Sequence, residues 1–439
     1  MKVSNRVGLF SMCFAMSFPV VAEETLRIAT VSNPDMERMQ KLSPHFTKAN
    51  PDIKLDWVVL DENSLRQKVT TDIATKSGQF DIVTIGAYET PLWAKQGWLV
   101  DLKGMPAEYD AQDIFPAVRE SLSYEGGLYA APFYAESSFT MYRSDLFDSV
   151  ELVMPEQPSW DFIESAAAKI SAKHTDVNGI CLRGKVGWGE NMALIMSMAN
   201  SYGARLFDME WQPELTGDAW GKTINDYTRL LQKYGPEQPE QQGFKELLNL
   251  FKDGKCAIWI DATVAASAIT DPATSSVADK VAFASAPDAG LGKKSNWLWS
   301  WALGVSNASE KQEAAKRFVQ WATSKEYIEL VATSEGWSNV PPGTRQSLYQ
   351  NQDYLAAAPF AELTLSAILS AEPNSPAVQE VPYKGIQFAD IPEFTGIGTA
   401  IGSQVARALK GDISVSEAQE NAQWVTSEVM SHAHFIGNK

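Results

Sequence analysis

The sequence predicts an α/β protein built of two lobes. Three observations carry this prediction: the chain length, the alternation of strands and helices near the N-terminus, and a change of pattern after Gly126 and Gly127. A chain of 439 residues is too long for one compact core, so two lobes or domains are expected. Hydrophobic residues make up 45% of the chain, as in an ordinary globular protein, which argues against pervasive disorder.

The N-terminal region alternates strands with helices. Apolar runs and alternation predict three strands, at residues 26–31, 53–59 and 80–85. Between them we expect helices from Pro34 to Phe46 and from Ser64 to Thr75, the first capped by Asn33. Strands joined by single helices predict a parallel sheet covered by helices.

Polar residues follow two of these strands. In parallel sheets, ligands bind beyond the carboxyl ends of the strands. Asn33 and Asp35 follow the first predicted strand, and Tyr88 and Glu89 follow the third. These four side chains are therefore candidate ligand contacts, with a helix cap or a turn as the alternative role of each.

The pattern changes after Gly126 and Gly127. Residues 128–134 and then the stretch from Ser137 to Arg143 have strand character with no helical period, so this region could carry the chain from one lobe to the other. Glu136 and Ser137 would then lie beside a cleft near the hinge. Both are candidate ligand contacts, and a turn role is the alternative. Farther along, residues 314–322 form an amphipathic helix.

The N-terminus has the features of an export signal. Lys2 and Arg6 precede an apolar stretch from Val7 to Val21, and small residues lead up to Ala22. We expect cleavage after Ala22, because the residues before Cys13 do not suit a lipoprotein signal. No later segment has the length and apolarity of a membrane span.

The charge and the histidines exclude several function classes. A formal net charge of −17 repels phosphate backbones and anionic lipids, so nucleic-acid binding is not expected. His45 and His174 are isolated, and His432 and His434 lie near the C-terminus, so no metal site is expected. No motif indicates a cofactor.

Removal of the signal leaves Cys181 and Cys256 as the only cysteines. Two cysteines in an oxidising compartment can form a disulfide. They can equally remain as two buried thiols, because a disulfide requires a separation that the sequence alone does not fix.

Polar side chains elsewhere suit a small, neutral, hydroxyl-rich ligand. Arg183 can donate to two adjacent hydroxyls, with a surface ion pair as its alternative role. Glu190 and Asn191 can bind a ligand at a helix start or cap that helix. Asp261 ends an apolar strand, where it either accepts from a ligand or caps the next helix. Arg345 follows a rigid Pro-Pro-Gly-Thr sequence and is either a donor in the cleft or a solvated turn residue.

Three tryptophans, Trp297, Trp299 and Trp301, alternate along the chain. On a strand they share one face. Indoles suit the apolar C–H faces of sugars and polyols. We expect Trp299 and Trp301 to contact the ligand and at least one of the three to pack in the core.

A series of motifs runs in order through the chain. They are Phe80-Asp81-Ile82-Val83, Gly127-Leu128-Tyr129-Ala130-Ala131-Pro132, Met141 to Phe147, Phe251 to Trp259, and Phe318-Val319-Gln320-Trp321-Ala322. In this order the sequence resembles the extracellular solute-binding proteins of ABC sugar importers, sugar-binding family 1. A narrower resemblance is to the polyol-binding branch, which serves mannitol and sorbitol uptake. It rests on Cys181 to Gly184, Gly187 to Asn191, Trp259 to Thr263, and Asn296 to Trp301.

The resemblance implies a two-lobed periplasmic binding protein fold, type II-like, with discontinuous lobes and hinge strands around a ligand cleft. A signal peptide at 1–22 is then followed by a first lobe, 23–135 plus 302–345, and a second, 136–301 plus 346–439. Trp188, inside one polyol-branch motif, joins the candidate ligand contacts.

The resemblance also implies a function. The protein would be the periplasmic, monomeric binding component of an ABC importer, closing on a polyol such as mannitol or sorbitol and delivering it to an inner-membrane permease with ATPase subunits. A binding protein for a mono- or oligosaccharide is one alternative. The other is an enzyme, a secreted carbohydrate hydrolase that uses two carboxylates.

Overall fold

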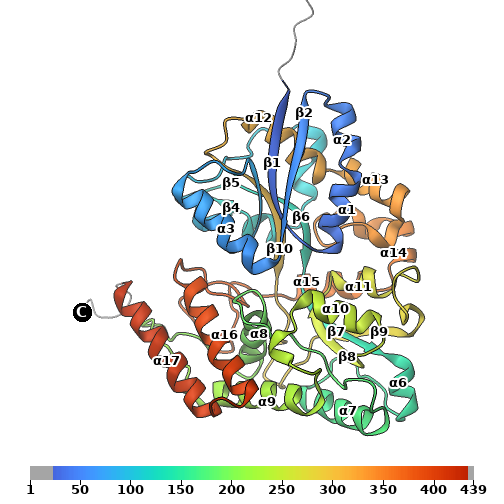
Figure 1. Cartoon of the computed structure of the whole chain (residues 1–439), viewed down its shortest axis with the longest axis vertical. Helices are drawn as coiled ribbons and strands as arrows, with labels where there is room; N and C mark the ends of the chain where they lie inside the picture. The colour runs from blue at the N-terminus through green and yellow to red at the C-terminus, as the bar shows by residue number, and fades with distance from the viewer. Residues whose placement is uncertain (1–22, 434–439) are drawn as a thin grey trace, which may run out of the picture.

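The computed structural model describes residues 23–433 as two lobes, one above the other in Figure 1. This arrangement confirms the two-lobed α/β prediction. The predicted signal segment, 1–22, and His434 lie outside the described residues. Within residues 23–433, no helix combines the length and apolarity that crossing a bilayer requires.

The first lobe, upper in Figure 1, is built on a five-stranded sheet with the spatial order β2-β1-β3-β10-β6. Its strands are β1 (Glu24–Val31), β2 (Ile53–Leu60), β3 (Ile82–Gly86), β6 (Ala131–Glu136) and β10 (Trp299–Val305). The three N-terminal strands are parallel, as predicted. The sheet is mixed because β10 runs antiparallel to both β3 and β6.

Helices pack around this sheet (Figure 1). They are α1 (Pro34–Leu42), α2 (Pro44–Ala49), α3 (Glu62–Thr75), α4 (Glu89–Lys95), α5 (Pro116–Ser121), α12 (Gln312–Ala322) and α13 (Lys325–Glu335). A short hairpin pairs β4 (Ser123–Tyr124) with β5 (Gly127–Leu128). The single helix predicted from Pro34 to Phe46 is wrong: it is interrupted at Ser43, because Pro44 lacks the N–H that a continuous helix needs.

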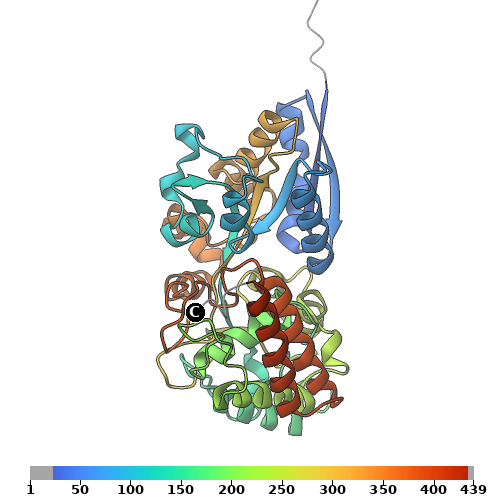
Figure 2. The ribbon, with the colours of Figure 1, turned by 90° about the vertical axis from the view of Figure 1, so that its left-hand side faces the viewer.

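The second lobe contains a three-stranded antiparallel sheet, β8 (Ile258–Ala262), β7 (Ser138–Arg143) and β9 (Val281–Ser285), with β7 central. Its helices are α6 (Ser144–Ser149), α7 (Trp160–Lys173), α8 (Asn191–Ser201), α9 (Asp218–Tyr234), α10 (Phe244–Lys252), α11 (Ala265–Ile269), α16 (Phe394–Lys410) and α17 (Val415–His432). Every residue of α8 is buried, so α8 forms part of the core of this lobe. Figure 2 shows α16 and α17 packed side by side on its outside. Helices α14 (Gln352–Ala357) and α15 (Ala361–Leu369) lie near the junction of the lobes (Figure 1).

The chain crosses between the sheets at Ser137, which separates β6 from β7. The N–H of Ser137 donates to the hydroxyl of Thr263 at 3.2 Å, and its own hydroxyl accepts from the amide of Asn296 at 3.4 Å. The return crossing enters the first sheet at Trp299. The predicted lobe boundary after Trp301 therefore falls inside β10, and residues 299–301 belong to the first sheet. The predicted boundary before Glu136 likewise falls inside β6, so Glu136 also belongs to the first sheet. The remaining boundaries stay a prediction.

Cys181 and Cys256 form a disulfide, with their Cα atoms 6.0 Å apart. The N–H of Cys181 also donates to the carbonyl of Ile258 at 2.8 Å. The disulfide thus ties the segment that leads to Arg183 to the segment that leads into β8, which carries Asp261.

Candidate functional site

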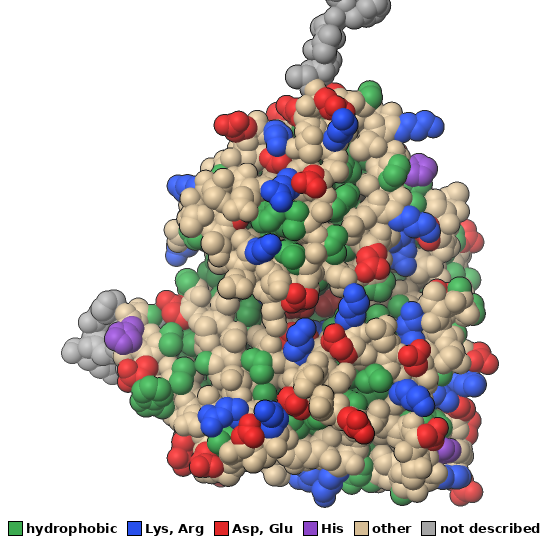
Figure 3. All heavy atoms as spheres, viewed as in Figure 1, with side chains coloured by type: hydrophobic (Ala, Val, Ile, Leu, Met, Phe, Trp, Pro, Cys, Tyr) green, Lys and Arg blue, Asp and Glu red, His purple; other side chains and the backbone are tan. Residues whose placement is uncertain are grey.

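A cavity of about 280 Å³ is lined by both lobes. Figure 3 shows acidic and basic side chains gathered where the lobes meet. The first lobe contributes the ends of β1, β2 and β6 and the starts of β10 and α3. The second contributes several residues between Arg183 and Ala193, the start of α10, and Ala262 and Val264. The volume lies near the lower end of the roughly 300–1,000 Å³ that is usual for small-molecule sites, so it suits a small ligand.

Tryptophans form one wall of the cavity. Trp299 and Trp301 are the first and third residues of β10 and both line the cavity, so the alternation does place these two on one face. Trp297, just before the strand, lines it too. The rings of Trp299 and Trp301 lie 5.6 Å apart, and Trp188 from the second lobe lies 5.9 Å from Trp299. All three are also buried in the hydrophobic core, so the prediction that at least one of them packs in the core is confirmed.

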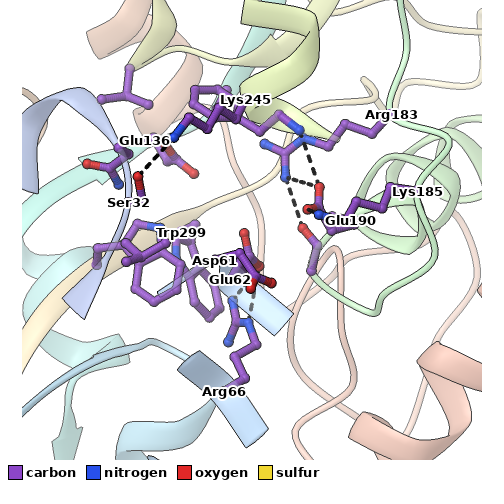
Figure 4. A pocket seen from close by; sticks show the side chains of 18 of the residues that line it. Ser32, Asp61, Glu62, Arg66, Glu136, Arg183, Lys185, Glu190, Lys245 and Trp299 are labelled. Atoms are coloured by element: carbon purple, nitrogen blue, oxygen red, sulfur yellow. Dashed lines mark hydrogen bonds and ion pairs between the residues drawn. The ribbon is translucent and has the colours of Figure 1, made fainter. Parts of the chain in front are cut away.

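Arg66 on α3 lies against this wall. Its guanidinium carbon is 3.9 Å from the centroid of Trp188, 5.0 Å from that of Trp299 and 4.9 Å from that of Trp301. Glu62 accepts from Arg66 at 2.9 Å (Figure 4). Glu89 forms a second ion pair with Arg66. The side chain is therefore held in place by two carboxylates and three indoles.

Arg183 is held from behind by Asp261. Its Nη2 lies 2.6 Å from Oδ1 of Asp261, and its Nε donates to the same carboxylate at 3.0–3.1 Å. The indole N–H of Trp259 and the backbone N–H of Ala262 also donate to this carboxylate, at 3.1 and 2.6 Å. Asp261 is only 1% exposed and does not line the cavity, whereas Arg183 does.

Two buried carboxyls in the cavity have a raised pKa. The pKa of Glu190 is raised to about 7, because burial and the nearby Glu62 raise it by more than Arg183 and Lys185 lower it. Burial also raises the pKa of Glu136 well above its usual range. Carboxyls of this kind can carry a proton near neutral pH and then donate a hydrogen bond.

The lobes also contact each other directly across the cavity. Asn63 on α3 donates to the carbonyl of Val186 at 3.1 Å, and Lys245 donates to the hydroxyl of Ser32 at 3.3 Å (Figure 4). Gly189 allows the close approach beside these contacts, because a Cβ there would lie 2.1 Å from Oε1 of Glu62.

The structure divides the residues predicted from sequence into two groups. The following line the cavity: Asn33, Glu136, Arg183, Trp188, Glu190, Trp299 and Trp301. The following do not: Asp35, Tyr88, Glu89, Ser137, Asn191, Asp261 and Arg345. Asn33 also caps α1 by accepting from the N–H of Met36 at 2.9 Å, which confirms the predicted cap; its contact with a ligand stays a prediction.

Several residues of the second group support the cavity. Glu89 accepts from the N–H of Gly86 at 3.0 Å and pairs with Arg66. Tyr88 donates to the carbonyl of Ile391 in the second lobe at 2.9 Å, and its ring lies 4.9 Å from that of Trp188. These side chains act on the cavity through the residues that line it.

The others serve the fold. Asp35 forms an ion pair with Arg38 at 2.8 Å, and Asn191 donates to the carbonyl of Gly402 at 2.9 Å. Arg345 is 1% exposed and donates to the carbonyls of Asp110 and Thr323 at 3.1 and 3.0 Å, away from the cavity. The solvated-turn alternative for Arg345 is therefore wrong as well.

Sequence reasoning missed several residues that line the cavity. They are Ser32, Asp61, Glu62, Arg66, Tyr134, Lys185, Phe244, Lys245, Glu246 and Gln387. Asp61 and Glu62 follow the second strand, so the rule that selected Asn33 and Tyr88 would have found them. Arg66 lies one turn into a polar helix, where the sequence does not mark which side faces the cavity.

Residues 30–329 match the family described as bacterial extracellular solute-binding protein. The chain belongs to this family. The mannitol-binding protein of Pseudomonas aeruginosa is 50% identical to this solute-binding protein over 435 residues, which span 99% of this chain and 100% of that one.

Solved structures agree with this membership. An ABC transporter solute-binding protein from Agrobacterium vitis, with bound D-mannitol, has a TM-score of 0.93 and 56% identity and covers 94% of this chain and 100% of its own. A ribitol complex from Agrobacterium radiobacter is 24% identical, has a TM-score of 0.82 and covers 93% of this chain and 99% of its own. The second similarity shows the shared fold. These relatives are solute-binding proteins and not enzymes, so the hydrolase alternative is set aside.

Proposed function

We propose that this solute-binding protein is the periplasmic component of an ABC importer for a polyol, with D-mannitol as the first candidate. The observation that carries the proposal is the small cavity lined both by indoles, Trp299 and Trp301 of the first lobe and Trp188 of the second, and by buried arginine and carboxyl groups. Relatives over the full length of the chain are a mannitol-binding protein and a mannitol complex, which supports the choice of ligand.

The cavity offers a polyol two kinds of contact. The indole faces suit its apolar C–H groups, and Arg183 provides fixed donors for its hydroxyls. Asn33, Glu136 and Glu190 can accept or donate around the remaining hydroxyls. Micromolar affinity corresponds to about 8 kcal/mol, so burial of the C–H face and a preformed cavity must add to the hydrogen bonds.

Both lobes supply these contacts, so a bound polyol favours the closed arrangement over an open one. In the proposed cycle the closed form docks on the membrane permease, whose ATPase subunits drive uptake. The protein acts as a monomer that has been exported and cleaved after Ala22.

Calorimetry on the chain from residue 23, freed of ligand by unfolding and refolding, tests the function. We expect D-mannitol or D-sorbitol to bind, and a hundredfold excess over Kd to stabilise the protein by about 2.7 kcal/mol in a thermal melt. Ribitol, glucose and maltose serve as comparisons. Binding of maltose or glucose with no response to any polyol would establish the saccharide alternative instead.

The position of Trp299 gives a second prediction. A Cβ on Gly86, the last residue of β3, would lie 1.9 Å from Cζ2 of this indole. Because the ring is rigid, Gly86→Ala must displace it, and we expect the Kd for the polyol to rise about tenfold.

Gly396 offers the matched control, because a Cβ there meets nothing within 4 Å. Calorimetry should give Gly396→Ala the affinity of the parent protein. Equal affinity of Gly86→Ala and the parent would show that the polyol does not depend on where Trp299 lies.

A further inference from the structure

Glu136 holds a distinctive place in the cavity. It is the last residue of β6, and it lies opposite Trp299 in the register with β10. Its side chain lines the cavity, yet the residue is only 6% exposed. Among residues 23–433, no side chain or backbone group forms a hydrogen bond or ion pair with its carboxyl, and Figure 4 draws it without one.

The other acidic residues that line the cavity all have partners. Glu62 pairs with Arg66 at 2.9 Å, and Asp61 accepts from the N–H of Ser64 at 3.2 Å. Glu190 lies 3.7 Å from Nη1 of Arg183 and 3.8 Å from Nζ of Lys185. Glu246 accepts from the N–H of Gly243 at 3.0 Å. Glu136 is thus the buried acid whose hydrogen-bonding capacity is left for a ligand.

The charged surroundings of Glu136 favour its neutral form. Burial is the main effect and raises its pKa well above the usual range. Asp261 on β8, Glu62 on α3 and Asp35 on α1 raise it further, and Arg183 opposes them. Tyr134 lies on the same strand, and the pKa of its phenol is raised well above its usual value. The phenol is therefore neutral and supplies no charge that would offset a carboxylate at Glu136. A buried carboxylate without a hydrogen-bonded partner would be strongly unfavourable here.

We propose that Glu136 binds the ligand as a neutral carboxylic acid, whose O–H donates to one hydroxyl and whose carbonyl oxygen accepts from a neighbouring hydroxyl. This inference rests on the proposed polyol function. It identifies Glu136 as the group that would recognise two neighbouring hydroxyls of the ligand. A carboxylate only accepts, whereas a protonated acid presents one donor and one acceptor. Each hydroxyl of a vicinal diol can donate or accept, so the acid and the diol satisfy each other.

The inference predicts how affinity depends on pH. In an open, ligand-free form Glu136 is better hydrated, so its pKa is lower than in the closed complex. Binding then takes up a proton at any pH between these two pKa values. Affinity is therefore complete below the pKa of the free form, and it falls by about tenfold per pH unit as pH rises between the two values.

The test measures D-mannitol binding by calorimetry from pH 6 to 9.5 on the parent chain, Glu136→Gln and Glu136→Ala. Glutamine has the shape of the neutral acid and also presents one donor group and one acceptor. We expect Glu136→Gln to bind within about threefold of the parent at pH 6 with a flatter pH profile, and Glu136→Ala to bind about thirtyfold more weakly.

Glu190→Gln is the matched control, because Glu190 is the other cavity acid with a raised pKa. The affinity of Glu190→Gln should still fall with rising pH to the extent that depends on Glu136, whereas the affinity of Glu136→Gln should not. Thermal melts establish that each variant is folded.

Two results would overturn the inference while polyol binding stands. One is that Glu136→Gln binds as weakly as Glu136→Ala, which would mean that the ligand needs a carboxylate. The other is that Glu136→Ala binds like the parent. Failure of the parent chain to bind any polyol at pH 6 would instead overturn the proposed function, and the role of Glu136 with it.

Discussion

Replacing Asp261 by alanine should lower the free energy of unfolding by about 3–5 kcal/mol, because it leaves the buried guanidinium of Arg183 without its nearest, hydrogen-bonded counter-charge. The carboxylate accepts from Arg183, Trp259 and the N–H of Ala262 in a position that is 1% exposed. Ligand affinity should fall at least about tenfold, although Asp261 does not line the cavity, because Arg183 loses the group that orients it.

Urea unfolding followed by circular dichroism measures the stability, and calorimetry measures the affinity. Asp279→Ala is the control, since Asp279 is an exposed aspartate of the same lobe and should change stability by less than about 0.5 kcal/mol. A variant at position 261 that is destabilised but binds the polyol as tightly as the parent would show that Arg183 needs no such support.

Removal of the disulfide is the other change with a large expected effect. Cys181 and Cys256 are 75 residues apart in sequence, and both are fully buried. The bond restricts the unfolded chain, so the double variant Cys181→Ser, Cys256→Ser should lose about 2–5 kcal/mol of stability. Because the bond also ties together the segments that carry Arg183 and Asp261, affinity should weaken as well.

The comparison of urea midpoints with and without a reducing agent isolates the bond. The parent chain from residue 23 contains these two cysteines alone, so a reductant should lower its midpoint and leave that of the double serine variant unchanged. Identical midpoints of parent and double variant would mean that the disulfide contributes nothing to stability.

Much of the fold could be predicted because local signals are strong in the first lobe. Apolar alternation located β2, and Asn33 before Pro34 marked the start of α1. The return of β10 into the first sheet was not predictable, because strand order depends on contacts between segments that are far apart in the sequence. For the same reason, the lobe boundary predicted after Trp301 falls inside β10.

The site was predictable where one strand carries several of its residues. The alternation of Trp299 and Trp301 correctly predicted a shared face. Arg183 and Asp261 were both expected to contact the ligand. Arg183 lines the cavity, whereas Asp261 lies behind Arg183 and accepts hydrogen bonds from it. A sequence identifies the type of a side chain and can indicate its helix or strand. Which of two neighbouring side chains faces the cavity and which lies behind it is decided only when the elements pack. Arg66 was missed for the same reason, since its three indole partners come from both lobes.

The contact between Trp188 and Trp299 also provides an intrinsic fluorescence signal for the arrangement of the two lobes. The two indoles belong to different lobes, and their ring centroids lie 5.9 Å apart with the Arg66 cation against them. Separation of the lobes would change the surroundings of both emitters at once. The proposed hinge closure can therefore be tested by intrinsic fluorescence, with no dye and no added label.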